Sequence, residues 1–150
     1  MNNIDICETN DLILQTSLIA GQNQQVKDIR QVPALTLAYL GDSIYELVIR
    51  TTLVENGMSH VDSLNRRASG YAKAPTQAKI FQIIEPELNE EELGYYKRGR
   101  NAKSGSVAKS GTVAEYRIAT GFEALMGFLY LSGRIDRILE LVSKGIEGIM

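Results

Sequence analysis

Signals for the start and end of helices recur along this 150-residue chain and favour an all-helical fold. Asn89-x-x-Glu92 and Thr112-x-x-Glu115 both match the capping box, in which paired side chains satisfy the free N–H groups of a first helical turn. Gly133 stands where a long apolar helical pattern stops, as helix-ending glycines do. Pro33 suits the first turn of a helix and Gly57 is well placed to end that helix, so neither indicates a strand turn. The chain is therefore predicted to be all-α.

The expected organisation is one domain preceded by an arm. Residues 1–32 are polar and weakly patterned, and we expect an N-terminal arm or a short helix there, with the domain over residues 33–150. Residues 99–111 contain three glycines and three serines, which predicts an exposed basic loop. Apolar periodicity and capping signals predict helices over residues 34–56, 60–69, 75–84, 89–98, 112–132 and 134–149.

The composition excludes several classes of protein. With 44% apolar and 23% charged residues, the chain can form a real core. Cys7 is the only cysteine and His60 the only histidine, so neither an internal disulfide nor a zinc site can be assembled. Residues 1–11 carry three acids and no base, unlike a signal or transit peptide, and no apolar run reaches the ~18 residues that span a bilayer. We expect a cytoplasmic protein without a membrane segment.

Charge is unevenly distributed along the chain. The formal net charge is −2, yet residues 65–79 carry four bases and no acid, and residues 97–117 carry six bases and one acid. Such segregation predicts a dipolar molecule with one face that attracts phosphate groups, although charge runs also occur on ordinary solvated surfaces.

The helix expected over residues 34–56 has apolar residues on two sides. Leu37 and Ile44 fall on one stripe, whereas Ile49 and Leu53 fall on the opposite side. A helix of this kind packs against two partners. Either it is the central helix of a monomeric bundle, or its second partner is another copy of the chain.

Glu123 is the acid in the least ordinary place. Helical spacing puts it among Tyr116, Ala119, Met126 and Tyr130 rather than on a polar face. A carboxylate in apolar surroundings stays ionised only with a cation, a metal or several hydrogen bonds, and otherwise its pKa rises and it is neutral. An ion pair with an arginine, or a glutamate at the helix edge that bends out to water, would equally explain the position.

Asp42 gains interest when it is considered together with Glu123. If the helices that carry them pack against each other, the two carboxylates converge, and a hard cation such as Mg²⁺ suits oxygen ligands of this kind. Such a metal would activate water and neutralise charge on a phosphodiester, while the basic segments bind the polyanion.

Three stretches of the sequence resemble one bacterial family. LAYLGDSIYE at residues 37–46, RGRNAKSG at residues 98–105 and TGFEALMGFLYL at residues 120–131 closely resemble the Mini-ribonuclease III family, which has the ribonuclease III catalytic domain but no double-stranded-RNA-binding domain. The resemblance extends from about residue 33 to the end of the sequence. The RGRNAKSG stretch distinguishes the mini family from full-length ribonuclease III.

The resemblance implies a ribonuclease III-like helical bundle that acts as a homodimeric, Mg²⁺-dependent endoribonuclease. Its implied substrate is double-stranded RNA, and its implied role is maturation of the large-subunit (23S) ribosomal RNA precursor. It implies that each subunit cuts one strand and leaves a 5′-phosphate and a 3′-hydroxyl.

By position, Asp42 matches the catalytic acid of the family's LGD motif and Glu123 matches the metal-binding glutamate of FEAL, so both are expected to be catalytic and to bind the metal. Full-length ribonuclease III has two further acids where this chain has Ala38 and Thr120, and the family has a His in the segment that contains Asn65. The residues expected to bind RNA come from the basic stretch and are Lys97, Arg98, Arg100, Asn101, Lys103 and Lys109.

Two other functions use parts of the same pattern. A non-catalytic helical protein that binds structured RNA would need the basic stretch but neither acid. An all-helical nucleotide pyrophosphohydrolase would also use Mg²⁺ and acids, but that class clusters several glutamates at helical spacing. The only dense acidic run here, residues 90–92, is a helix start.

Overall fold

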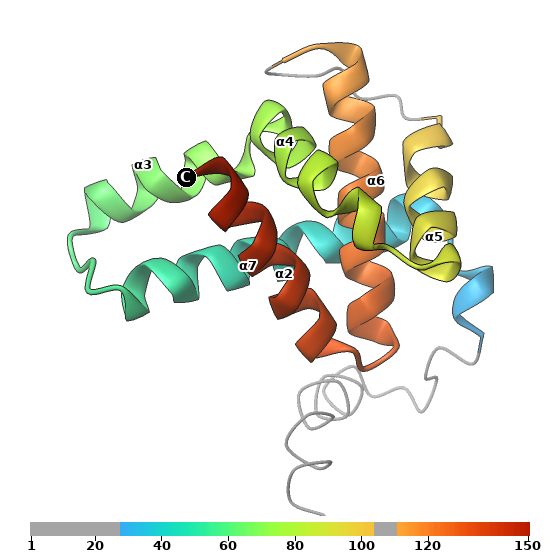
Figure 1. The fold of residues 1–150 in the computed structure, drawn as a ribbon, viewed down its shortest axis with the longest axis horizontal. Coiled ribbons are helices and arrows are strands. Elements are labelled where there is room, and N and C mark those ends of the chain that lie inside the picture. The colour runs from blue at the N-terminus through green and yellow to red at the C-terminus, as the bar shows by residue number, and fades with distance from the viewer. Residues whose placement is uncertain (1–27, 104–110) are drawn as a thin grey trace, which may run out of the picture.

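The computed structural model describes residues 28–103 and 111–150, and every regular element within them is a helix (Figure 1). The all-α prediction is confirmed. Residues 1–27 of the predicted arm, including Cys7, lie outside the described part of the chain. The elements are the 3-10 turns η1 (Ile29–Gln31) and η2 (Glu85–Glu87) and the helices α2 (Ala34–Glu55), α3 (Val61–Ala72), α4 (Ala74–Ile84), α5 (Glu90–Asn101), α6 (Val113–Leu131) and α7 (Ile135–Ile149).

Both predicted capping boxes are present. The Asn89 side chain accepts from the Glu92 N–H at 2.8 Å, and the Glu92 carboxylate accepts from the Asn89 N–H at 3.0 Å. Thr112 and Glu115 make the same reciprocal pair at the start of α6. The sequence pattern therefore located these two helix starts correctly.

Several predicted boundaries were wrong. Helix α3 continues to Ala72, past its predicted end at residue 69. Pro33 is the N-cap of α2 rather than part of its first turn, because its backbone is extended, with ψ at 144°. Helix α5 continues through Gly99 to Asn101, past the predicted end at residue 98. Gly99 does not end the helix, because its bare Cα allows α5 to approach α6: a Cβ there would lie 2.6 Å from the Cβ of Ala124.

Helix α6 is the centre of the molecule. Figure 1 shows it crossing α2, with α4 and α5 on either side and α7 in front. It packs against all four of these helices, and a helix surrounded in this way is apolar on nearly every face. No described helix is both long enough and apolar enough to cross a membrane. The α6 side chains with at most 1% exposure are Phe122, Ala124, Leu125, Met126, Phe128 and Leu129.

Two glycines allow α2 and α6 to approach each other until their backbones touch. A Cβ on Gly41 would lie 1.7 Å from the carbonyl oxygen of Glu123, and a Cβ on Gly127 would lie 2.0 Å from the carbonyl oxygen of Leu37. Both obstacles are backbone atoms, which cannot rotate away as a side chain can. Glycine is therefore required once on each helix at this crossing.

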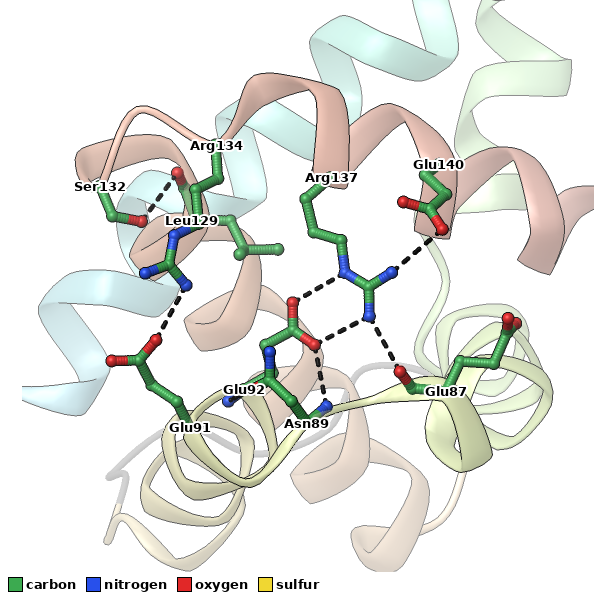
Figure 2. A network of polar contacts seen from close by, with 9 residues as sticks. All are labelled: Glu87, Asn89, Glu91, Glu92, Leu129, Ser132, Arg134, Arg137 and Glu140. Carbon is green, nitrogen blue, oxygen red and sulfur yellow. Dashed lines mark hydrogen bonds and ion pairs between the residues drawn. The ribbon is translucent and has the colours of Figure 1, made fainter.

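A buried ion pair fastens the start of α5 to α7 (Figure 2). Glu92 is only 1% exposed, and Arg137 donates to both of its carboxylate oxygens at 2.8 and 2.9 Å. Arg137 also donates to the Glu87 carbonyl oxygen at 2.9 Å. The Arg137 guanidinium holds the pKa of Glu92 below its ordinary value. Such a forked pair fixes orientation more than a single ion pair does.

We expect Gly41→Ala to lower the free energy of unfolding by about 3 kcal/mol or more, because the added methyl group forces the α2 and α6 backbones apart. The control is Gly94→Ala in α5, where a Cβ meets nothing within 4 Å. That change should raise stability by about 0.5–1 kcal/mol through helix propensity. Urea denaturation of both variants measures the difference, and equal stabilities would contradict the proposed role of Gly41.

Candidate active site

The crossing of α2 and α6 brings the two acids singled out in the sequence together. Asp42 directly follows Gly41, the residue whose Cα faces the backbone of Glu123. Asp42 is exposed and Glu123 is half-buried, so the pair lies at the surface end of the contact. The predicted convergence of the two carboxylates is therefore present in the structure.

The Glu123 carboxyl is in an unfavourable place for a charge. Burial is the largest cause of a raised pKa here, and together with the neighbouring Asp42, which acts as a hydrogen-bond partner and a negative charge, it brings the pKa of Glu123 to about 9. Within the described ranges Glu123 has no ion pair with a Lys or Arg side chain, so the arginine pairing considered for it is not found there. At neutral pH the acid is protonated in the protein alone, and a cation would be needed to ionise it.

Two further polar residues, Gln77 and Tyr45, lie near enough to Glu123 to interact with it electrostatically, and the sequence analysis missed both. The amide of Gln77, from α4, lies beside the Glu123 carboxyl and acts to lower its pKa. Tyr45, from α2, is 1% exposed, donates its hydroxyl to the Tyr71 carbonyl oxygen at 2.7 Å and packs edge-on against the Phe122 ring. A signal existed for Gln77, since it shares one helix face with the apolar residues of α4.

The donor set of this site is small. Among the described residues no group of three or more His, Cys, Asp or Glu side chains is placed to hold a metal ion. Ala38 and Thr120, where full-length ribonuclease III has acids, are buried, and the Thr120 hydroxyl donates to the Tyr116 carbonyl oxygen at 3.0 Å. Two carboxylates with solvent access nevertheless suit Mg²⁺, which keeps several of its waters when protein oxygens bind it.

The residues expected to bind RNA differ in whether their side chains already make contacts within the fold. Lys97, Asn101 and Lys103 are exposed, whereas Lys109 lies outside the described residues. Arg98 donates to the Val32 carbonyl oxygen at 2.9 Å and lies 5.0 Å above the Tyr95 ring. Arg98 therefore already makes contacts within the fold.

Arg100 is also partly engaged. It lies 5.5 Å above the Tyr96 ring and donates to the side-chain oxygen of Asn101 at 3.2 Å. Among the expected RNA contacts in the described chain, the two lysines are thus the cations with the fewest internal contacts.

A pocket connects the basic end of α5 with α6. Its volume is about 600 Å³. Thr120 lies one helical turn before Glu123, so the pocket follows α6 toward the acidic pair. It is lined by Gly99, Asn101, Ala102, Lys103, Val113, Tyr116, Arg117 and Thr120.

The second basic segment is elsewhere. Asn65, Arg66 and Arg67 are exposed on α3, and Figure 1 shows α3 and α5 at opposite ends of the molecule. The bases on α3 and those at the end of α5 therefore lie far apart in one copy of the chain.

Comparison with known proteins agrees with this architecture. The family model described as the ribonuclease III domain matches residues 35–134. The X-ray crystal structure of a protein from Fusobacterium nucleatum superposes with a TM-score of 0.73 at 35% identity, covering 83% of this chain and 99% of that one. Fold and family model together define a ribonuclease III domain.

Several relatives carry the name Mini-ribonuclease 3. The protein of Desulfitobacterium hafniense is 53% identical over 110 residues, which is 73% of this chain and 69% of the relative. That of Symbiobacterium thermophilum is 45% identical over 118 residues, with 79% and 91% covered, and that of Enterococcus faecalis 46% over 126 residues, with 83% and 96% covered. The chain belongs to the Mini-ribonuclease III family and is a ribonuclease III-type endoribonuclease. This assignment takes the place of the nucleotide pyrophosphohydrolase alternative.

The raised pKa of Glu123 predicts how the metal-free protein responds to pH. Because the folded-state pKa is about 9 against an ordinary 4.5, the folded protein holds a proton that the unfolded chain releases between these values. Stability therefore falls as the pH rises through this range. In EDTA, the melting temperature should fall between about pH 5 and about pH 9, and Glu123→Gln should remove that part of the decline. Parallel curves for the two proteins would contradict the assignment.

Proposed function

We propose that this endoribonuclease cuts double-stranded RNA in a Mg²⁺-dependent reaction, with Asp42 and Glu123 as the catalytic and metal-binding residues. The observation that carries the proposal is the meeting of these two acids at the α2–α6 crossing, one turn along α6 from a pocket that Lys103 and Arg117 line. We further propose the large-subunit (23S) ribosomal RNA precursor as the substrate, processed in the cytoplasm. The family membership supports this choice of substrate.

The two acids are suited to different parts of the task. Asp42 is exposed and within reach of a large polyanion, whereas Glu123 is half-buried and held by the packed core of α6. Both would hold Mg²⁺, and a like-charged pair this close is stabilised by a divalent cation. Mg²⁺ bound there supplies an activated water and neutralises charge on the phosphodiester.

RNA binding is proposed for the exposed end of α5. Lys97, Asn101 and Lys103 would contact backbone phosphates and 2′-hydroxyls, since A-form duplexes are recognised mainly by shape. Arg98 and Arg100 would support this surface as well as contact RNA, because each packs on a tyrosine of α5. Binding through so few cations should be modest and strongly salt-dependent.

A homodimer is proposed through the outer face of α2. That face carries the large hydrophobic side chains Tyr39 (82% exposed), Leu47 (56%) and Val54 (57%). Asp42 lies on the same side of the helix, one turn after Tyr39. A second copy that covers this face would border the catalytic pair and place two sites on one duplex.

An end-labelled RNA duplex tests the activity. We expect Mg²⁺-dependent cuts on both strands that leave 5′-phosphate ends, and a loss of at least about 100-fold in rate for Asp42→Asn and for Glu123→Gln, since each variant removes one metal-binding carboxylate. The measurement is the single-turnover rate, with melting temperatures to show that the variants fold.

Binding without cleavage would favour the non-catalytic RNA-binding alternative, and unchanged cleavage in both variants would exclude these acids. Lys97→Ala/Lys103→Ala should weaken duplex binding without loss of stability. The charge control is Lys144→Ala on α7, whose side chain pairs with Glu87.

Sedimentation velocity tests the dimer. The wild type should sediment at twice the mass of one chain, and Tyr39→Asp/Leu47→Asp should sediment as a monomer, because buried carboxylates at an apolar interface oppose association. The control is Leu139→Asp on α7, which is also an exposed apolar residue (46%). A monomeric wild type at micromolar concentration would refute the proposed interface.

A further inference from the structure

Gln77 is a buried polar residue on an apolar face of its helix. It is 1% exposed and shares one face of α4 with Ile80, Phe81 and Ile84, which are at most 2% exposed. Its side-chain nitrogen, Nε2, has no hydrogen-bond partner among the residues that the structure describes. Among the described residues, Gln77 Nε2 is the one buried side-chain nitrogen or oxygen without a hydrogen-bond partner.

The fold alone gives no reason for this amide. A buried donor without an acceptor costs about 1–3 kcal/mol, and an apolar side chain of similar size would avoid that cost. Gln77 therefore makes the packing of α4 less stable than an apolar residue would. We look for its role in a neighbouring group to which the amide can donate a hydrogen bond.

The neighbour is Glu123. Helix α4 packs directly on α6, and the Gln77 amide lies close enough to the Glu123 carboxyl to oppose the rise in its pKa, although no hydrogen bond between them has closed. An amide N–H only donates, and an ionised carboxylate only accepts, so the two groups are complementary once Glu123 carries its charge.

Burial also limits what Gln77 can do. Its Nε2 has almost no solvent-accessible surface, so the atom cannot reach the RNA or a cation in the site. Any contribution to the reaction must pass through a side chain that does reach them. Glu123, half-buried between Gln77 and the exposed Asp42, has this intermediate position.

We propose that Gln77 is a positioning residue, whose Nε2–H donates to the carboxylate of Glu123 and fixes the orientation in which that carboxylate binds the divalent cation. The inference rests on the proposed function of Glu123. Hydrogen-bond partners of metal ligands act in this way, and their loss lowers metal affinity or activity by about 10–100-fold.

The test is Gln77→Met, which keeps the length of the side chain but removes the amide. In EDTA its melting temperature should equal or exceed that of the wild type, because an unpartnered donor is lost. Calorimetric titration with Mg²⁺ alone should show binding weakened by about 10-fold, and the Mg²⁺ concentration for half-maximal cleavage should rise by a similar factor. Duplex affinity without Mg²⁺ should stay within about twofold of the wild type, as expected for a buried residue remote from the RNA.

Gln82→Met is the matched control, since it makes the same change on the exposed side of α4. Gln77→Leu is the second variant, with a shorter, branched side chain. A loss of stability in both Gln77 variants would overturn the proposal, because the amide would then support the fold. Normal Mg²⁺ affinity in stable variants would overturn it too. If Glu123→Gln still cleaves RNA, the proposed function itself fails, and this result is distinct from a failure confined to Gln77.

Discussion

The backbone contact between α2 and α6 is the constraint on which the rest of the molecule depends. Gly41 and Gly127 each remove a side chain at the point where the other helix passes. The close crossing places Asp42 next to Glu123, and it leaves α6 deep enough to be surrounded by α4, α5 and α7. The site is therefore a consequence of packing: the same contact that closes the core creates the pair of acids.

Much of this arrangement followed from local sequence signals, and the errors share one cause. Capping boxes located the starts of α5 and α6 because they depend on hydrogen bonds within one turn. Gly99 misled the boundary prediction, since its reason for being glycine is contact with α6 rather than the end of a helix. Ile49 and Leu53 were assigned to a second packing face, but both are buried in the core, while Leu47 is exposed. Periodicity gives the faces of a helix but does not say which one meets the core.

The candidate site was predictable in part. Asp42 and Glu123 could be predicted from the sequence, because Asp42 stands in a motif and Glu123 is an acid within an apolar helix. Gln77 has the same kind of anomaly, a polar residue on the apolar face of α4, but an amide carries no charge and attracts less notice than a carboxylate. The convergence of the three residues comes from helices that are distant in sequence. Spacing alone therefore cannot give it, and the tertiary structure is needed.

The candidate site contains two energetically unfavourable groups, whereas the fold around it is firmly packed. Burial and Asp42 together oppose the charge on Glu123, and the Gln77 amide nitrogen has no hydrogen-bond partner within residues 28–103 and 111–150. Both costs would be relieved by the same event, ionisation of Glu123 beside a cation, because that event offsets the negative charges and completes the amide hydrogen bond. The forked pair of Glu92 and Arg137 and the glycine crossing supply rigidity elsewhere. A fold this rigid can keep Glu123 and Gln77 in an unfavourable arrangement until a bound cation makes that arrangement favourable.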